Sequence, residues 1–571
     1  MRRANVLLVQ SQIAEEAIAR GISTRFGPFE KHGADHLRAW ISECVARLPD
    51  EFRVDLIAYV LAMPAIVLGT MCSGTDSPFL VTLALVEAVF LASGSRCAVE
   101  MAKKHVVHRF ACEKNEKKQA FLMTMFAPPR GSLQYLFSDV EMLADCDVLH
   151  DCLSGHKVQN PDVGDITDLA IGFPCQDVSK LNMRRAGNLT VVRDGAKRTG
   201  AVFQGLVRYL KRPSSRKARN LMESFAIGLQ GVLLENVCGL VEAPRGVDPE
   251  TGEGWHSNLD FCIQALEELG WACITFILDP LIFGFPVHRR RVWILALPPH
   301  ILAALGMMMA ELEELALRVM KMFVIRRCED MRDLEDLLCE DTHPGVLASF
   351  KQQQRRSTLP AKRKRSRMAP KWPEAHAKEF DKNGRDWWEP SHPGGSMVAR
   401  FQGLAAINDR EFDLLALHRT SFPDAKGTQD IGSSGNRTSV RHNCSHIITP
   451  HMKLYLRHRC RVATSFEAMM LQGIHYGDNM HLVHAMDPSN VQDLAGNAFQ
   501  TWCCAASQLV LWLLRARAWQ NATRQHPSAG PGPPSHTAAG DDSDSESLSS
   551  VLGPPAAHRG DLLDELLLGR Q

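Results

Sequence analysis

The spacing of apolar residues changes at about residue 62 of the chain. Residues 36–63 place apolar side chains three and four positions apart, a spacing that predicts helices, and residues 1–62 are interpreted as a helical extension. From residue 63 to about residue 298, short apolar runs rich in β-branched residues alternate with longer amphipathic stretches. The short runs predict strands over 65–71, 106–112, 134–138, 168–173, 231–235, 271–278 and 291–297.

The alternation of strands and helices predicts the fold class. Several strands are nearly continuous in apolar residues, as expected for strands buried on both faces of a mostly parallel sheet. We therefore predict a doubly wound α/β domain whose ligand lies beyond the carboxyl ends of the strands. The connecting helices are predicted over 79–93, 115–126, 201–211 and 259–270.

Beyond residue 298 the alternation stops, and the sequence predicts further parts. Within an irregular region, 300–325 is interpreted as one long packed helix, because charged residues interrupt it and argue against a membrane span. Regular structure returns at about residue 456, and a C-terminal stretch rich in Pro, Gly, Ser and Asp predicts disorder. The predicted parts are 1–62, 63–298, 299–455, 456–523 and 524–571.

Composition and charge place the chain among ordinary globular proteins. Of 571 residues, 45% are hydrophobic and 23% are charged, with a formal net charge of +1. The N-terminal apolar run is too short for a secretory signal, so a reduced, intracellular environment is expected. The 16 cysteines include no Cys-x-x-Cys pair, and Cys444 with His442 and His446 lacks a second ligand pair, so no metal site is predicted.

A basic run, "KQQQRRSTLPAKRKRSRMAPKW", occupies residues 351–372. It holds nine Lys or Arg and no acid. We interpret it as a linker or a nuclear localisation signal in preference to a phosphate-binding segment. The expected location is the nucleus, with the cytoplasm left open.

Polar residues with chemical potential follow the predicted strands. A turn that contains a glycine follows one strand, and each of the next two strands ends in an acid. This arrangement suits an adenosine nucleoside, in which one acid binds the ribose hydroxyls and the other binds the adenine amine. Because no complete Gly-x-Gly-x-x-Gly is present, S-adenosylmethionine is favoured over a dinucleotide. The strand-end candidates are Gly74, Glu113, Asp139, Pro174, Cys175, Glu235 and Asn236, with Arg289 and Arg291 at the start of the last strand.

Five motifs resemble those of DNA (cytosine-5) methyltransferases. "GFPCQDVS", "LLENVCGL", "GFPVHRRRVWIL", "CRVATSFEAMMLQG" and "AGNAF" occur in the family's order, over about residues 66 to 515. The resemblance implies a Rossmann-like S-adenosylmethionine-dependent fold with an inserted target-recognition domain at 299–455. It also implies that a cytosine is flipped out of DNA to reach Cys175.

The resemblance implies a role for each candidate residue. Carbon 5 of cytosine is a weak nucleophile, and a thiolate that adds to carbon 6 turns the ring into an enamine that is reactive at carbon 5. A protonated carboxyl at N3 and a cation at O2 would offset the charge that develops on the ring. By resemblance, the catalytic residues are Cys175, Glu235, Arg291 and Arg289, the cofactor-binding residues are Cys72, Gly74, Glu113, Asp139, Pro174 and Asn497, and Asn236 braces the Glu235 loop.

Three features depart from the family pattern. The cofactor loop, usually Phe-x-Gly-x-Gly-Gly, reads Cys72-Ser-Gly-Thr-Asp-Ser-Pro, and Asp76 is left either to repel the cofactor's carboxylate or to bind its amine. A glutamine of the family is Val287 here. Cys175 and Glu235 are also separated by 60 residues, and the insert includes the basic stretch "KRPSSRKAR".

Two alternatives to a DNA methyltransferase remain open. A tRNA cytosine-5 methyltransferase has the same fold, although its usual Cys-Phe-Thr signature is absent. The altered cofactor loop suggests the second alternative, a catalytically inactive relative that binds nucleic acid. Binding of S-adenosylmethionine would argue against this alternative.

Overall fold

The computed structural model describes most of the chain. The described residues are 5–20, 36–179, 190–214, 216, 218–243, 256–349, 426–433 and 440–525, with a few positions between 351 and 415. The basic run beyond residue 351, most of the predicted tail from 524 and part of the "KRPSSRKAR" insert lie outside these residues. The nuclear localisation inferred from the basic run therefore stays a prediction.

The core of the protein is an eight-stranded sheet with the order β1-β9-β10-β8-β7-β2-β3-β4. Every neighbouring pair is parallel except the two pairs that involve β10. All seven predicted strands are present, so the predicted α/β class is confirmed. The strands are β1 (Val6–Leu8), β2 (Ile66–Met71), β3 (Val106–Cys112), β4 (Tyr135–Phe137), β7 (Asp168–Ile171), β8 (Gly231–Val237), β9 (Ala272–Leu278) and β10 (Arg291–Leu297).

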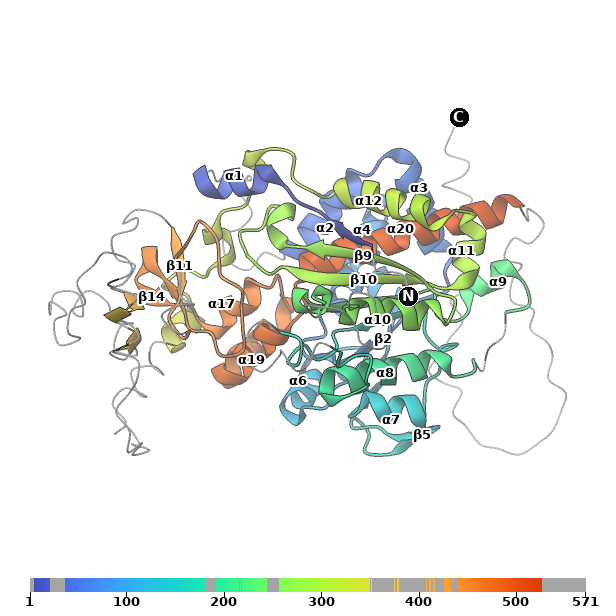
Figure 1. Cartoon of the computed structure of the whole chain (residues 1–571), viewed down its shortest axis with the longest axis horizontal. Helices are drawn as coiled ribbons and strands as arrows, with labels where there is room; N and C mark the ends of the chain where they lie inside the picture. The colour runs from blue at the N-terminus through green and yellow to red at the C-terminus, as the bar shows by residue number, and fades with distance from the viewer. Residues whose placement is uncertain are drawn as a thin grey trace. The chain divides into compact units, whose positions relative to one another are not determined.

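Helices cover both faces of this sheet (Figure 1). Alternate residues of β10 enter two separate apolar clusters: Trp293 and Leu295 pack into one, and Val292 and Ile294 into the other. The first cluster is covered by α2 (His36–Ala46), α3 (Asp50–Ala62), α4 (Ser77–Ala92), α5 (Ala98–His105), α6 (Glu116–Phe126) and α20 (Thr501–Gln525). The second is covered by α7 (Val140–Asp145), α8 (Lys197–Lys211) and α10 (Asn258–Glu267).

The helical interpretation of residues 1–62 does not hold at the start of the chain, which forms a strand. There β1 forms the sheet edge and pairs in parallel with β9, placing Val6 opposite Thr275. Three residues are too few to show a strand period, so the tertiary pairing decides their conformation. Two other short strands, β5 (Val148–His150) and β6 (Lys157–Gln159), form a hairpin that the sequence analysis also missed.

The single helix predicted over 300–325 is also wrong. The chain forms α11 (Pro299–Leu305) and α12 (Met309–Lys321), and Gly306 caps α11 in the left-handed region at φ 62°. Both helices pack against α20, although they lie inside the predicted target-recognition region. No helix in the described parts of the chain is both long and apolar enough to cross a membrane.

A second, antiparallel sheet follows within residues 427–462. Its strand order is β12-β11-β13-β14, and it extends past the predicted boundary at 455. Short helices then lead back to α20. These elements are β11 (Gly427–Asp430), β12 (Val440–His442), β13 (Leu454–Leu456), β14 (Arg461–Val462), α17 (Ser465–Met470), α18 (Met480–Ala485) and α19 (Pro488–Asn497), and two further described helices are α1 (Gln12–Arg20) and α9 (Leu221–Ala226).

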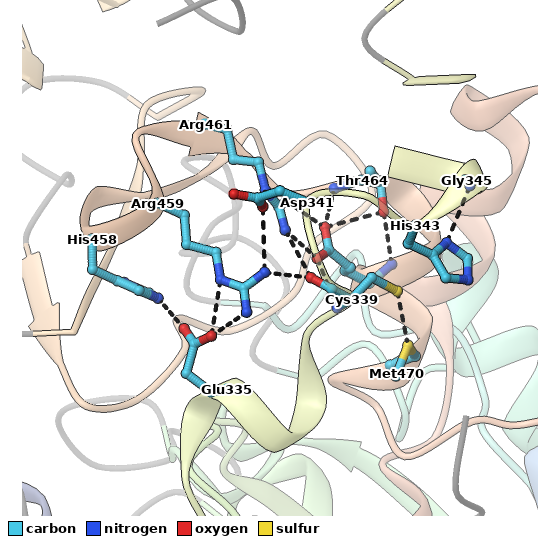
Figure 2. Close-up of polar contacts among 11 residues, drawn as sticks. Glu335, Cys339, Asp341, His343, Gly345, His458, Arg459, Arg461, Thr464 and Met470 are labelled. Atoms are coloured by element: carbon cyan, nitrogen blue, oxygen red, sulfur yellow. Dashed lines mark hydrogen bonds and ion pairs between the residues drawn. The ribbon is translucent and has the colours of Figure 1, made fainter. Parts of the chain in front are cut away.

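Ion pairs join this second sheet to residues 335–341 (Figure 2). Arg461 donates to both oxygens of the buried Glu467 at 2.8 Å and to Asp341 at 2.6 Å. Glu335 accepts hydrogen bonds from His458 and Arg459. Burial by itself would raise the pKa of Glu335, but these hydrogen bonds outweigh burial and lower its pKa to about 2.

A buried ion pair attaches the last helix to the sheet. Both terminal nitrogens of the Arg515 guanidinium lie 2.8 Å from Asp168 Oδ1, and its Nε donates to the Gln230 carbonyl at 3.0 Å. Trp512 Nε1 donates to the same Asp168 oxygen at 3.1 Å. Arg515 is completely buried, so α20 is fixed at the amino ends of β7 and β8.

We expect Arg515→Leu to lower the free energy of unfolding by about 3–5 kcal/mol, because it leaves the Asp168 carboxylate buried without a cation. Urea denaturation followed by circular dichroism measures the change. Lys103→Ala is the control, since it breaks only the exposed pair with Glu100 and should cost less than about 1 kcal/mol. Equal losses of unfolding free energy in Arg515→Leu and Lys103→Ala would contradict the stabilising role of the buried Arg515–Asp168 pair.

The ion pairs of Glu335 make a second prediction, for the pH dependence of stability. A carboxylate whose pKa is lowered on folding stabilises the folded protein at pH values above 4.5, its ordinary pKa. This stabilisation disappears as the pH falls through about 2, its pKa in the folded protein. The difference in unfolding free energy between the wild type and Glu335→Gln should therefore be largest near neutrality and shrink in acid. Urea titrations at pH 7 and pH 3 measure it. A difference that stays constant would show that the ion pairs contribute nothing.

Candidate active site

All ten residues that the sequence analysis assigned to the site line one cavity of about 550 Å³. The cavity opens at the carboxyl ends of β2, β3, β4, β7 and β8, where a doubly wound sheet binds its ligands. The ten are Cys72, Gly74, Glu113, Asp139, Pro174, Cys175, Glu235, Arg289, Arg291 and Asn497.

Side chains from other elements hold the loop that carries Cys175. The Asn236 amide donates to the Phe173 carbonyl at 3.0 Å, and the Thr199 hydroxyl donates to the Pro174 carbonyl at 2.7 Å. Asn236 follows Glu235 on β8, so it couples the ends of β7 and β8 as the resemblance implied. Thr199 lies in the first turn of α8 and was missed, because nothing in the sequence places a threonine 24 positions away beside this loop.

Close backbone packing also shapes this loop. A β-carbon on Gly172 would lie 2.2 Å from Phe499 Cε1, so only glycine admits the phenylalanine of the "AGNAF" motif at this point. Phe499 in turn contacts Trp293 of β10, with ring centroids 5.5 Å apart. The "GFPCQ" and "AGNAF" motifs therefore form one packed unit.

Glu235 and Arg291 form an ion pair at the cavity wall. The Nε of Arg291 lies 3.1 Å from Glu235 Oε1, and both side chains are 12% exposed. Burial raises the pKa of Glu235, while Arg291 and then Arg289 act in the opposite direction and only reduce the increase. The net effect is a pKa above the ordinary value for a glutamate carboxyl.

The surroundings of the Cys175 thiol shift its pKa in both directions. Burial raises its pKa above the ordinary value, Arg291 lowers it, and Glu235 raises it again. The thiol of Cys175, the carboxyl of Glu235 and the guanidinium of Arg291 therefore lie on one wall of the cavity. The charge of Arg291 acts on both Cys175 and Glu235.

Arg289 has a different set of contacts. Its guanidinium is buried and donates to the carbonyls of Ile448 (2.8 Å), Gly496 (3.2 Å) and Ala498 (2.6 Å). These bonds join the start of β10 to two distant segments. They favour a positioning role for Arg289 over the catalytic role that the sequence analysis gave it.

The cofactor loop is tied to Glu113 through the backbone. Gly74 N–H donates to Glu113 Oε2 at 3.0 Å, and Asn115 N–H donates to Oε1 at 2.9 Å. Each carboxylate oxygen keeps a free acceptor position, as binding of a ribose hydroxyl requires. A β-carbon on Gly74 would meet nothing nearer than 3.9 Å, so the loop leaves open space beside it.

Asp139 already has two partners in this structure. Its Oδ1 accepts from Glu141 N–H at 2.9 Å, which caps α7, and its Oδ2 accepts from Lys114 Nζ at 2.6 Å. The lysine directly follows Glu113 and was not identified from the sequence. An adenine amine would share the Asp139 carboxylate with it.

The remaining cofactor-side residues come from the ends of β7 and α19. Asn497 is the last residue of α19, and its side-chain amide donates to the carbonyl of Asp493 at 2.8 Å. A β-carbon on Gly496 would lie 2.1 Å from Pro450 N, so glycine is required for this approach. Across the described residues, no group of three or more His, Cys, Asp and Glu side chains is arranged as metal ligands.

Alkylation of Cys175 by iodoacetamide tests the electrostatics of this wall. Arg291→Ala removes the cation that favours the thiolate, so we expect slower alkylation. Glu235→Gln removes an opposing negative charge and should give faster alkylation, each by about two- to tenfold in rate. Peptide mass spectrometry at pH 8 gives the rate at Cys175, and the exposed Cys97 serves as the internal control. Changes in the same direction for both variants would refute the arrangement.

Two curated proteins are similar to part of this chain. The DNA (cytosine-5-)-methyltransferase DMT5 of Cryptococcus neoformans is 28% identical over 262 residues, which are 46% of this chain and 9% of that protein. The type II methyltransferase M.NlaIV of Neisseria lactamica is 30% identical over 138 residues, covering 24% of this chain and 27% of that protein. The chain thus spans well under two thirds of the length of either relative.

Solved structures similar to this one include EhMeth of Entamoeba histolytica, with a TM-score of 0.37, and Dnmt2 of S. pombe, with a TM-score of 0.35. Each is 10% identical and covers 79% of this chain and 98% of its own. The model of the family of C-5 cytosine-specific DNA methylases matches residues 148–475, a range that includes Cys175, Glu235 and Arg291. Because this match covers more than half of the chain, the protein belongs to the C-5 cytosine-specific DNA methylase family.

Proposed function

We propose that this protein transfers a methyl group from S-adenosylmethionine to carbon 5 of cytosine in DNA through a covalent bond between Cys175 and carbon 6. The observation that carries the proposal is that Cys175, Glu235 and Arg291 share one cavity with Glu113 and Asp139. One set of residues suits the base and the other suits an adenosine, so a single cavity holds both reactants side by side.

The residues present fit S-adenosylmethionine. Glu113 has free acceptor positions for the ribose hydroxyls, and Gly74 leaves open space beside the loop. Asp139 lies at the end of the next strand, where it would accept from the adenine amine, and Pro174 and Asn497 would face the methionine part. When bound, this cofactor supplies an electrophilic methyl group.

Cys175 begins the reaction in this proposal. Its thiol loses a proton, and the sulfur adds to carbon 6 of the base while Glu235 donates a hydrogen bond or a proton at N3. Arg291 stabilises the negative charge at O2. Once carbon 5 carries the methyl group, loss of its proton to a base and departure of the Cys175 sulfur restore the aromatic ring.

The proposal takes DNA as the substrate. The family model is that of DNA methylases, and DMT5 is named a DNA methyltransferase. The tRNA alternative uses the same chemistry and is tested in the same experiment.

Covalent trapping tests the proposal. Protein and S-adenosylmethionine are mixed with DNA duplexes or with tRNA that carry 5-fluorocytosine, whose fluorine blocks release of the enzyme after methyl transfer. We expect a denaturation-resistant adduct with DNA that requires the cofactor and is absent in Cys175→Ala. Cys238→Ala is the matched control, because Cys238 follows β8 near the cavity and should leave the adduct intact.

An adduct that survives in Cys175→Ala would overturn the mechanism, and an adduct with tRNA alone would overturn the choice of substrate. With an unmodified substrate, Glu235→Gln should reduce the turnover number by about 100- to 1,000-fold, the scale for loss of a group that stabilises transition-state charge.

A further inference from the structure

The cofactor loop is built differently from a glycine-rich loop. Its residues 72, 74 and 76 all have left-handed backbone conformations, with φ of 54°, 52° and 53°, but only the middle one is glycine. Residues with a β-carbon adopt this region only where surrounding contacts enforce it. Cys72 and Asp76 therefore need surrounding contacts to hold their backbone in this conformation. Glycines at these two positions would not need such contacts.

The Asp76 carboxylate points away from the cavity. Asp76 precedes α4 at the N-cap position, where an aspartate usually accepts from the first helical N–H groups, yet its side chain makes no such bond. Its Oδ2 lies instead 2.9 Å from His108 Nε2, and both side chains are 0% exposed. Asp76 does not line the cavity, so it neither repels a bound carboxylate there nor binds an amine.

His108 is itself held rigidly on β3. Phe79, three residues after Asp76, stacks on the imidazole with centroids 4.5 Å apart and an interplanar angle of 14°. Phe126 of α6 meets the imidazole edge-on at 6.0 Å. The imidazole is thus fixed between two aromatic rings, with its Nε2 placed 2.9 Å from the buried Asp76 carboxylate.

The loop between these anchors is the part that lines the cavity. Ser73 N–H donates to the Cys112 carbonyl at 3.2 Å, and Gly74 N–H donates to Glu113 at 3.0 Å. The Tyr476 hydroxyl donates to the Thr75 carbonyl at 2.9 Å. Each loop residue from 73 to 76 therefore has at least one partner, and the Asp76–His108 pair secures the end from which α4 begins.

We propose that Asp76 and His108 are positioning residues for the cofactor, and that their buried pair holds the loop Cys72–Ser77 in its binding conformation in place of the glycines that the family usually has there. The inference rests on the proposed function, because it takes S-adenosylmethionine as the ligand. The pair acts through Gly74 and Cys72, which face the cavity, and has no contact with Cys175, Glu235 or Arg291.

A purely structural role would differ in its kinetic effect. A pair that only stabilised the fold would change the melting temperature and leave the cofactor KM of the folded enzyme unaltered. A positioning pair changes the cofactor KM and Kd while the turnover number stays the same, because the catalytic wall is formed by β7, β8 and β10.

The test compares variants that remove or keep the interaction. In Asp76→Gly/His108→Phe, glycine accepts φ 53° and phenylalanine keeps the aromatic packing, so no unpaired charge is buried. We expect the Kd for S-adenosylmethionine, measured by calorimetry, and the cofactor KM to rise by about tenfold or more, with a turnover number close to that of the wild type.

His108→Gln is the rescue variant, since its amide keeps a donor near the position of Nε2, and it should bind the cofactor almost as well as the wild type. His105→Phe is the matched control, because it replaces a buried histidine that packs against Phe90 and does not line the cavity. Should the double variant not fold, Asp76→Gly alone gives the test.

The outcomes separate this inference from the proposed function. A folded wild type that binds no S-adenosylmethionine would refute the proposed function. If the wild type binds the cofactor, two results for the pairless variant would overturn the role of the pair. The variant binds the cofactor equally well, or it loses only turnover or melting temperature. A raised KM in the pairless variant, together with recovery in His108→Gln, would support it.

Discussion

The buried pair between Arg515 and Asp168 is the contact on which the rest of the structure depends. Between β10 and α20 the chain forms α11, α12, the second sheet and several short helices, so the position of α20 has to be fixed by side chains. Arg515 does this at the amino end of β7, the same strand whose carboxyl end leads to Cys175. Gln508 and Arg517 add contacts to Thr82 and Asp55 along the helix. Desolvation of this pair is expensive, so its value lies mainly in fixing one arrangement of the helix.

Once α20 is fixed, the residues just before it are brought to the cavity. Phe499 packs into the space left by Gly172, and Arg289 binds the carbonyls on both sides of Asn497. The Cys175 loop, the start of β10 and the end of α19 consequently form one rigid corner. The charges of Glu235 and Arg291 are placed on that corner with little freedom, as preorganised electrostatic catalysis requires.

The seven predicted strands were visible in the sequence because strands buried on both faces are almost continuously apolar. The ten candidate site residues line one cavity because the family motifs stand at the ends of these strands, and their roles stay a prediction. Other features depend on contacts between distant segments: the strand β1, the contacts of Arg289 and the direction of the Asp76 carboxylate. The break at Gly306 had a local signal, a glycine within a helical stretch, but the apolar pattern on both sides of it concealed the turn. The predicted boundaries at 299 and 455 stay predictions, although α11 and α12 pack with the main domain and β14 continues the second sheet.

The two halves of the cavity are held by separate sets of contacts, and this separation explains how the glycines of the cofactor loop can change without disturbing the other half. The catalytic wall depends on Asn236, Thr199 and the glycine at 172, which hold the ends of β7 and β8. The cofactor loop depends on β3 through Glu113 and His108, and on Tyr476. A change in the glycines of the loop therefore alters contacts with β3 without moving Cys175. Because the buried contact between Asp76 and His108 can restrain a left-handed backbone that glycine would adopt freely, loss of those glycines is compatible with a retained cofactor site.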